Sequence, residues 1–362
     1  MLDIIETIQQ LTNIPSPTGY TAEIIGFLDE NLKKKGYQPE RNHKGSLMVT
    51  VKGNEDHKRR FVTAHIDTLG AMVRAIKPDG RLKIELIGGF TYHSIDGEYC
   101  TIHSAATGKE WTGTILLHQT SVHVYKDART AERSQDNMEI RLDAEVHSAK
   151  DVASLGIGVG DFISFAPRTE ITPSGYIKSR HLDDKASAAI LLQFLHRIAD
   201  ENLMLPYTTC FFFSNNEEIG YGGNSNMPPH TMEYLAVDMG AMGDDQQTDE
   251  YTVSICVKDG SGPYHFGLRQ QLVGLCESKA IPYKLDIYPF YGSDASAAMK
   301  AGWDVRHALI GPGIDASHAY ERTHRKSLDA CASLLEAYLS APIIEKKKKK
   351  KGIFNGKVKE NK

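Results

Sequence analysis

Apolar residues near the start of the chain recur at helical spacing. The first helix is predicted from four of them, Ile4, Ile5, Ile8 and Leu11. A second helix is expected over 21–35, where Gly36 ends it. Runs rich in β-branched residues predict strands over 46–51, 60–67, 207–213, 233–238 and 284–290, and helical patterns cover 186–198, 264–278 and 327–339. This alternation of helices and strands predicts an α/β fold.

The pattern changes between about Gly70 and Pro173. Short alternating runs separated by Gly and Asp turns predict strands over 82–87, 99–104, 112–117 and 161–165. Their spacing is typical of a small all-β barrel or sandwich. We therefore expect an α/β domain formed by 1–70 and 174–342, an inserted β domain at 71–173, and a lysine-rich tail at 343–362. The tail is expected to be disordered because its like charges repel one another.

Composition removes several classes of protein. The chain has 362 residues, with 42 Lys and Arg against 46 Asp and Glu, and six of the lysines form the run Lys346–Lys351. Without this tail the body is clearly acidic, which argues against a nucleic-acid surface. No stretch approaches the roughly 20 apolar residues of a membrane span. The start of the chain lacks the features of a signal peptide, so we expect a cytoplasmic protein.

The cysteines do not indicate a structural site. The chain has five of them, widely spaced and without a paired motif: Cys100, Cys210, Cys256, Cys276 and Cys331. Neither a disulfide framework nor a thiolate zinc site is indicated, and we expect buried free thiols.

Metal-ligating residue types follow apolar, strand-like runs at four places. The residues are His65, Asp67, Asp183, Asp184, Glu217, Glu218 and Asp238. The carboxyl ends of strands line the ligand crevice of an α/β sheet, so these side chains could converge there. Imidazole and carboxylate ligands without cysteine suit a catalytic zinc, cobalt or manganese centre. Each pair alone is more often a solvated face or a helix start, but their joint order favours a metal site.

The spacing also suggests separate roles for neighbouring residues. His65 and Asp67 would lie on the same side of a strand end, so that Asp67 could orient the imidazole ring. Adjacent Glu217 and Glu218 would point in different directions. One could then bind metal while the other faced a water molecule as a general base.

These motifs, followed by a late histidine, resemble the two-metal aminopeptidases that include bacterial glutamyl aminopeptidases and archaeal tetrahedral aminopeptidases. The resemblance extends from about residue 2 to 342. It implies a mixed-sheet metallopeptidase domain with helices on both faces and a barrel-like insert. It also implies that Asp183 bridges two divalent metal ions, that one ion takes His65 and Asp238, and that the other takes Glu218 and His318. Glu217 would be the general base, and Asp67 would orient His65.

The late histidine departs from the family pattern. The family resembles His-Ser-Pro-x-Glu at this point, whereas this chain reads Ser-His-Ala-Tyr-Glu-Arg-Thr-His from Ser317 to His324. Counting back from the closing helix favours His318 with one residue deleted, and His324 is the rival. Thr68 and Lys185 also differ from the usual residues. Substrate preference therefore does not transfer from the family.

Two further residues have open roles. Asp294 lies in a stretch that resembles a family loop near the active site, where it could position substrate or cap the following helix. His181 is a weaker candidate for a residue that supports the ligands.

The implied function is hydrolysis of N-terminal residues from peptides by a metalloaminopeptidase with two metal ions, zinc, cobalt or manganese. A homo-oligomer built through the insert is implied as well, from a dimer up to a twelve-subunit cage. The alternatives are a related two-metal carboxypeptidase, dipeptidase or deacylase, a glucanase, and an inactive scaffold. A glucanase would need two carboxylates and no metal.

Overall fold

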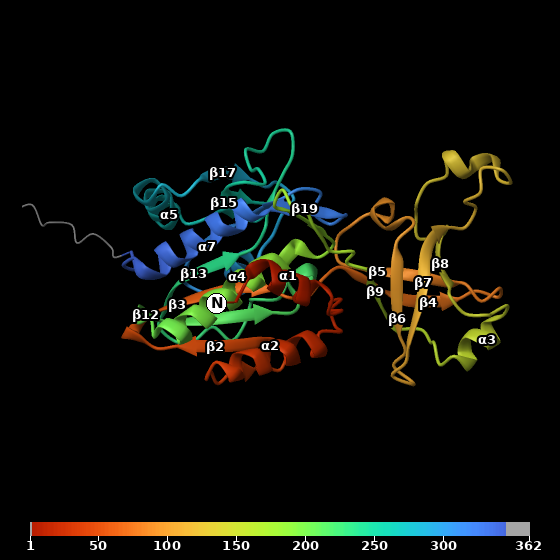
Figure 1. The fold of residues 1–362 in the computed structure, drawn as a ribbon, viewed down its shortest axis with the longest axis horizontal. Coiled ribbons are helices and arrows are strands. Elements are labelled where there is room, and N and C mark those ends of the chain that lie inside the picture. The colour runs from red at the N-terminus through yellow and green to blue at the C-terminus, as the bar shows by residue number, and fades with distance from the viewer. Residues whose placement is uncertain (1, 345–362) are drawn as a thin grey trace, which may run out of the picture.

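The computed structural model describes residues 2–344. Of the tail predicted to be disordered at 343–362, residues 343 and 344 are described and pack against the fold, which corrects the start of the tail. The lysine-rich remainder lies outside the described residues. Within the described residues the chain forms a large α/β layer structure and a separate barrel, which lie side by side along the long axis of the molecule (Figure 1). The prediction of an α/β fold with a barrel-like insert is confirmed.

A ten-stranded mixed sheet is the centre of the α/β part, within residues 2–344. Its order is β1-β2-β12-β3-β13-β18-β15-β16, with β14 beside β18 and β17 beside β15. Neighbours among β12, β3, β13 and β18 are parallel, whereas β2 runs antiparallel to β1 and β12. Strand β15 is antiparallel to β18 and β16 and parallel to β17. The strands are β1 (Glu40–Arg41), β2 (Leu47–Val51), β3 (Gly53–His65), β12 (Leu205–Ser214), β13 (Thr231–Val237), β14 (Gly240–Ala241), β15 (Val253–Asp259), β16 (Gly262–Pro263), β17 (Tyr283–Ile287) and β18 (Arg306–Ile314).

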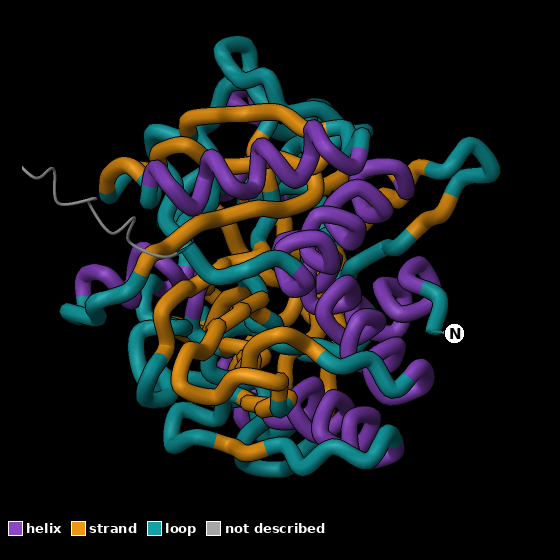
Figure 2. Tube along the Cα trace, turned by 90° about the vertical axis from the view of Figure 1, so that its left-hand side faces the viewer, coloured by secondary structure: helices purple, strands orange, loops and turns teal. Residues whose placement is uncertain are grey.

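Helices cover both faces of this sheet (Figures 1 and 2). One face packs into the main core against α1 (Ile4–Thr12), α2 (Ala22–Lys34), α4 (Leu182–Glu201), α5 (Phe266–Lys279) and α7 (Arg325–Ser340). The other face packs against α6 (Asp294–Lys300). In β12, Phe211 and Phe213 join the first core, while Cys210 and Phe212 join the second. Burial on both faces explains why this strand is an unbroken apolar run.

Two long strands of the sheet, β15 and β18, and the two-residue strands β1, β14 and β16 were not predicted from the sequence. Strand β18 contains Gly-Pro-Gly, which is typical of a turn. The structure explains Gly311, because a Cβ atom there would lie 1.6 Å from the carbonyl oxygen of Asp238. Gly313 has the same function, since its Cβ atom would lie 2.0 Å from the carbonyl oxygen of Asp249. These glycines mark a close approach of backbone rather than a turn.

The insert is a closed six-stranded barrel in the order β4-β5-β8-β7-β6-β9. Its strands are β4 (Gly70–Ile76), β5 (Leu82–Ile87), β6 (Tyr99–His103), β7 (Glu110–Leu117), β8 (Met138–Leu142) and β9 (Phe162–Phe165). The inward-facing residues form a core of their own, to which α3 (Ala149–Ser154) contributes Val152. The boundaries 71–173 and the role of the insert in assembly stay predictions.

A small three-stranded sheet connects the two parts. It consists of β10 (Glu170–Ile171), β11 (Tyr176–Ser179) and β19 (Glu321–His324). Three short 3₁₀ helices complete the elements of the described part of the chain, η1 (Tyr92–Ile95), η2 (Lys126–Arg129) and η3 (Glu217–Ile219). The five cysteines are free and buried. Among the described helices, none combines the length and apolar character of a membrane span.

Candidate metal centre

The predicted ligands converge at one edge of the large sheet. Strand β3 ends at His65, β12 leads into the 3₁₀ helix with Glu217 and Glu218, and β13 ends just before Asp238. Because these strands are parallel, their carboxyl ends meet at the same edge. Asp183 differs from the sequence interpretation, since it lies in the first turn of α4 rather than at the end of a sheet strand, with non-helical backbone angles.

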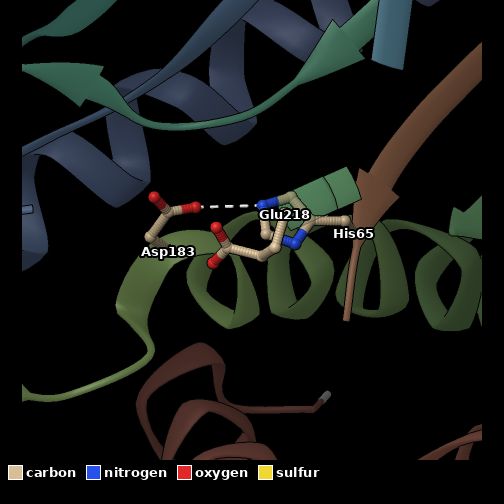
Figure 3. Close-up of side chains that lie close together, drawn as sticks. All are labelled: His65, Asp183 and Glu218. Atoms are coloured by element: carbon tan, nitrogen blue, oxygen red, sulfur yellow. Dashed lines mark hydrogen bonds and ion pairs between the residues drawn. The ribbon is translucent and has the colours of Figure 1, made fainter. Parts of the chain in front are cut away.

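Asp183 lies at the centre of the cluster. Its Oδ1 is 3.0 Å from Nε2 of His65 (Figure 3), and its Oδ2 is 3.3 Å from Nε2 of His318. Nε2 of His318 is also 3.6 Å from Oε2 of Glu218. The two oxygens of one buried carboxylate therefore face two different histidines, which is the arrangement of a bridging ligand.

The two histidines share a tautomer. Nδ1 of His65 lies 3.0 Å from the carbonyl oxygen of Asp67, and Nδ1 of His318 lies 2.7 Å from that of Gly89. A carbonyl only accepts hydrogen bonds, so Nδ1 is the donor in both rings. Both Nε2 atoms are thereby directed at the carboxylates, where a metal ion would bind.

Negative charge is concentrated in this buried space. Burial, reinforced by the charge of Asp183, raises the pKa of Asp238 to about 7. Burial raises the pKa of Glu218 well above its usual range, and Asp183 adds to the effect. Glu217 is raised likewise, by burial and then by the charge of Asp238, so that its pKa is well above that of an exposed glutamate. Such mutual repulsion is relieved when cations bind between the carboxylates.

The donors fit divalent metal ions. Three sets of three residues could each hold a metal ion, because the ligand atoms within a set lie no more than 4.8 Å apart. The sets are His65 with Asp183 and Glu218, His65 with Glu217 and Asp238, and Asp183 with Asp184 and Asp238. Oε1 of Glu218 and Oδ1 of Asp184 are buried without a hydrogen-bond partner among the residues the structure describes. Buried carboxylate oxygens without partners are costly unless a cation satisfies them.

Asp67 connects several parts of the centre. Its side chain accepts hydrogen bonds from the Thr18 hydroxyl at 2.7 Å and from the backbone N–H groups of Glu217 at 3.2 Å and Glu218 at 3.3 Å. Its Oδ1 is 3.5 Å from Nδ1 of His65, farther than its own carbonyl oxygen. The carboxylate therefore holds the Glu217–Glu218 turn, and the backbone carbonyl is the nearer partner of the imidazole.

His318, and not His324, lies with the other candidate ligands. His324 precedes α7, where its Nδ1 accepts from the N–H group of Lys326 and its Nε2 contacts the carbonyl oxygen of Ser174 at 2.9 Å. His181 is buried, and burial lowers its pKa to about 3; its ring contacts the carbonyl oxygen of Phe165 and no ligand side chain in the described part of the chain. The structure therefore does not place His324 or His181 among the ligands.

Asp294 neither caps α6 nor lies free to meet substrate. The cap is Ser293, which accepts from the backbone of Ser296. Asp294 instead accepts hydrogen bonds from the hydroxyl of Ser214 at 2.5 Å and from the N–H group of Gly223 at 2.6 Å. It therefore braces the two ends of the segment that carries Glu217 and Glu218.

Two more supporting residues were missed in the sequence. Lys44 donates to the carbonyl oxygens of Tyr221 and Gly222 on the far side of the same segment. Glu321 accepts from the N–H groups of Asp183 and His318. Contacts to backbone N–H and C=O groups leave no residue pattern, although the spacing His-x-x-Glu from His318 to Glu321 was a signal.

The centre opens into a cleft of about 710 Å³. Glu217, Asp238 and His318 lie at its base. Its walls are formed by the loop with Asp244 and Asp245, the loop 288–293, and the end of α6 with Lys300. This volume is in the range of sites that hold small organic ligands, and a short peptide end would fit.

Comparisons with known proteins bear on the family of this chain. Residues 45–334 match the family described as M42 glutamyl aminopeptidase. A Bacillus subtilis protein named "Putative aminopeptidase YhfE" is 65% identical over 94% of this chain and 98% of its own length. The glutamyl aminopeptidase of Lactococcus lactis is 26% identical over 61% of this chain and 62% of its own.

Solved structures show the same fold. The aminopeptidase APDkam598 from Desulfurococcus kamchatkensis superimposes with a TM-score of 0.82 at 22% identity, covering 93% of this chain and 94% of that protein. The TET1 peptidase of Pyrococcus horikoshii, which can assemble into a tetrahedron or a large octahedral shell, has a TM-score of 0.82 at 21% identity, covering 93% of this chain and 99% of that protein.

Proposed function

Because the chain belongs to the M42 glutamyl aminopeptidase family, which is metal-dependent, and is therefore a peptidase, we propose that it releases N-terminal residues from peptides with two divalent metal ions and Glu217 as general base. The observation that carries the two-ion proposal is Asp183, whose two oxygens face His65 and His318 separately. His65 and Asp238 would hold one ion, Glu218 and His318 the other, and Asp183 would bridge them.

The side chains divide the work of hydrolysis. When bound, the two ions would polarise the scissile carbonyl and acidify a water molecule, as zinc, cobalt or manganese can. Glu217 lines the cleft with its Oε2 3.8 Å from Nε2 of His65, so it would face the attacking water rather than lie behind the ligands. It would take the proton of that water and deliver it to the leaving amine. Asp67 would keep Glu217 in place through its backbone N–H group.

Peptide release from an unblocked library tests this function. Wild-type protein should trim free N-termini, a chelator should stop the reaction, and Glu217→Gln should lower kcat about 10²- to 10⁴-fold with metal still bound, because amide replaces base at constant shape. Glu336→Gln, on the surface of α7, is the matched control and should keep wild-type rates.

N-acetylated copies of the same peptides separate the alternatives. Equal cleavage of blocked peptides would favour the carboxypeptidase, dipeptidase or deacylase reading over the aminopeptidase. A glycosidase would survive chelation. Absence of any cleavage with metal bound would instead favour a scaffold.

We also propose that the protein acts in the cytoplasm as a homo-oligomer, with the barrel in the contact between subunits. Support comes from the shared fold with the assembling TET1 peptidase. Light scattering should give a mass above the 40.1 kDa of one chain. A stable monomer at micromolar concentration would contradict this proposal.

A further inference from the structure

Glu321 is a buried carboxylate behind the metal centre. It is the first residue of β19 and is 2% exposed. Its Oε1 accepts a hydrogen bond from the N–H group of His318 at 3.0 Å, and its Oε2 accepts one from the N–H group of Asp183 at 3.1 Å. One side chain therefore links the backbones of two candidate ligands that lie far apart in the sequence.

Neither ligand is held by regular secondary structure. Asp183 has φ −75° and ψ 103°, outside the helical range, although it lies within the bounds of α4. His318 has a φ of 64°, a left-handed conformation that non-glycine residues rarely adopt. Backbone in such conformations persists only when its surroundings hold it, and the hydrogen bonds accepted by Glu321 do so at both residues.

The imidazole of His318 is fixed independently of Glu321. Its Nδ1 donates to the carbonyl oxygen of Gly89. The following residue is held as well, because Nη1 of Arg180 donates to the carbonyl oxygen of Ala319 at 3.1 Å. Among these contacts, Glu321 is the group that joins His318 to Asp183.

We propose that Glu321 is a positioning residue that fixes the distance between Asp183 and His318 and so forms the site of the second metal ion. The inference rests on the proposed two-metal function. Glu321 accepts from backbone N–H groups and is not itself one of the proposed ligands. Replacing Glu321 should therefore lower the affinity for the ion bound by His318 more than the affinity for the ion bound by His65.

Cobalt titration of the full-length, metal-free protein tests the inference. The visible absorption of Co²⁺ reports ligand geometry at each site, and calorimetry gives the two affinities. In Glu321→Gln, one oxygen still accepts, but the amide group meets the other N–H group. We expect the second Kd to rise about 10- to 100-fold, the usual effect of losing a group that orients a ligand, and the first Kd to change less.

Two variants complete the design. Glu321→Asp keeps both acceptor oxygens on a shorter side chain and should give an intermediate affinity, which provides a second measurement if the Gln variant folds poorly. Asp161→Asn is the matched control in the barrel, since its two oxygens also accept from backbone N–H groups, those of Ala105 at 2.9 Å and Gly158 at 2.8 Å. It should leave both cobalt affinities and the absorption spectrum unchanged.

The outcomes are distinct. Wild-type affinity and spectrum at both sites in Glu321→Gln, even with a lower unfolding temperature, would show a merely structural residue and overturn the inference alone. A wild-type protein that takes up fewer than two ions would overturn the proposed two-metal function and the inference with it. Selective loss of the second ion would support both.

Discussion

Protons and metal ions compete for the histidines of the centre. Burial by itself would lower the pKa of His318, but its contact with Asp183 and the charge of Glu218 raise the pKa to about 11. The pKa of His65 is likewise raised well above its usual value, against the effect of burial, by Asp183 and Asp67. Both rings are therefore protonated at pH 7 in the metal-free protein, and metal binding must displace these protons.

Metal affinity should rise with pH for this reason. Because the metal-free pKa of His318 is about 11, affinity should increase about tenfold per pH unit between pH 6 and 9 for the proton displaced from this ring. Calorimetry in buffers of different ionisation enthalpy counts the protons. His318→Asn should reduce the count by about one, and His324→Gln should not. A binding enthalpy that is independent of the buffer would contradict the expectation.

The candidate metal ligands could be predicted from their residue types, but most of the residues that hold these ligands in place could not. His65, Asp183, Glu217, Glu218, Asp238 and His318 lie together as predicted, because imidazole and carboxylate side chains at strand ends have few other uses in such numbers. Their roles stay predictions. Gly89 was not predicted, because a hydrogen bond to a backbone carbonyl depends on tertiary geometry and leaves no pattern in the sequence. Glu321 was also missed, although its spacing from His318 was a signal.

At the level of elements, the end of α7 is fastened by a buried cation. Arg60 in β3 donates to the carbonyl oxygens of Tyr338, Leu339 and Ala341, and its Nε lies 3.2 Å from Oε2 of Glu233. Arg60 and Glu233 are both fully buried. The last carbonyls of a helix lack intrahelical partners, so a guanidinium in this position satisfies them and the helix dipole together.

Loss of this cation should destabilise the whole α/β part. Arg60→Met keeps most of the apolar volume but leaves the three carbonyl oxygens without their donor and removes one of the two cations beside Glu233, whose other cation is Arg306. We expect a loss of about 3–5 kcal/mol in the free energy of unfolding. Urea unfolding measures it. Glu233→Gln in the same chain should recover part of the loss, and Arg74→Met at an exposed pair should have little effect. A loss as small as that of Arg74→Met would refute the role of Arg60.

Helices with a regular spacing of apolar residues could be predicted from the sequence, whereas a strand whose residues are required by close contact with neighbouring backbone could not. The helix ends in α2, α5 and α7 fall within a few residues of the expected ranges. Strand β18 escaped because Gly311 and Gly313 are required by the neighbouring backbone, not by a turn. The glycines of β18 are explained by the close contact with the backbone at Asp238 and Asp249, and they do not indicate the conformation of the strand.

For the whole molecule, the barrel and the metal centre share a buried ion pair. Arg180, which precedes α4 and lies three residues before Asp183, is 2.5 Å from Glu98 of the barrel through its Nε. The same guanidinium contacts the carbonyl oxygens of Ser94 in the barrel and Ala319 beside His318. The position of the barrel is thereby connected to the position of a candidate ligand.

Weakening the ion pair between Arg180 and Glu98 should lower the activity at the candidate metal centre. Glu98→Gln removes the negative charge that holds the Arg180 guanidinium. Because Arg180 is then held less firmly, kcat/KM should be about tenfold lower than in the wild-type protein. Hydrogen exchange should quicken in 88–98 and around Ala319. Glu85→Gln on the exposed surface of the barrel is the control. Unchanged exchange and activity in Glu98→Gln would show that the barrel sits independently of the centre.

The order of elements along the chain also determines which part of the protein can fold first during synthesis on the ribosome. The barrel strands are contiguous from 70 to 165 and carry their own core, so the barrel can fold as soon as it has emerged. The large sheet cannot form this early, because β3 pairs with β12 and β13, which are synthesised after the barrel. Arg60 in β3 also needs the carbonyl groups at the end of α7. A nascent chain would therefore expose β2 and β3 beside a finished barrel until nearly all of the protein has been translated, and the proposed two-metal centre would lack His318 until then.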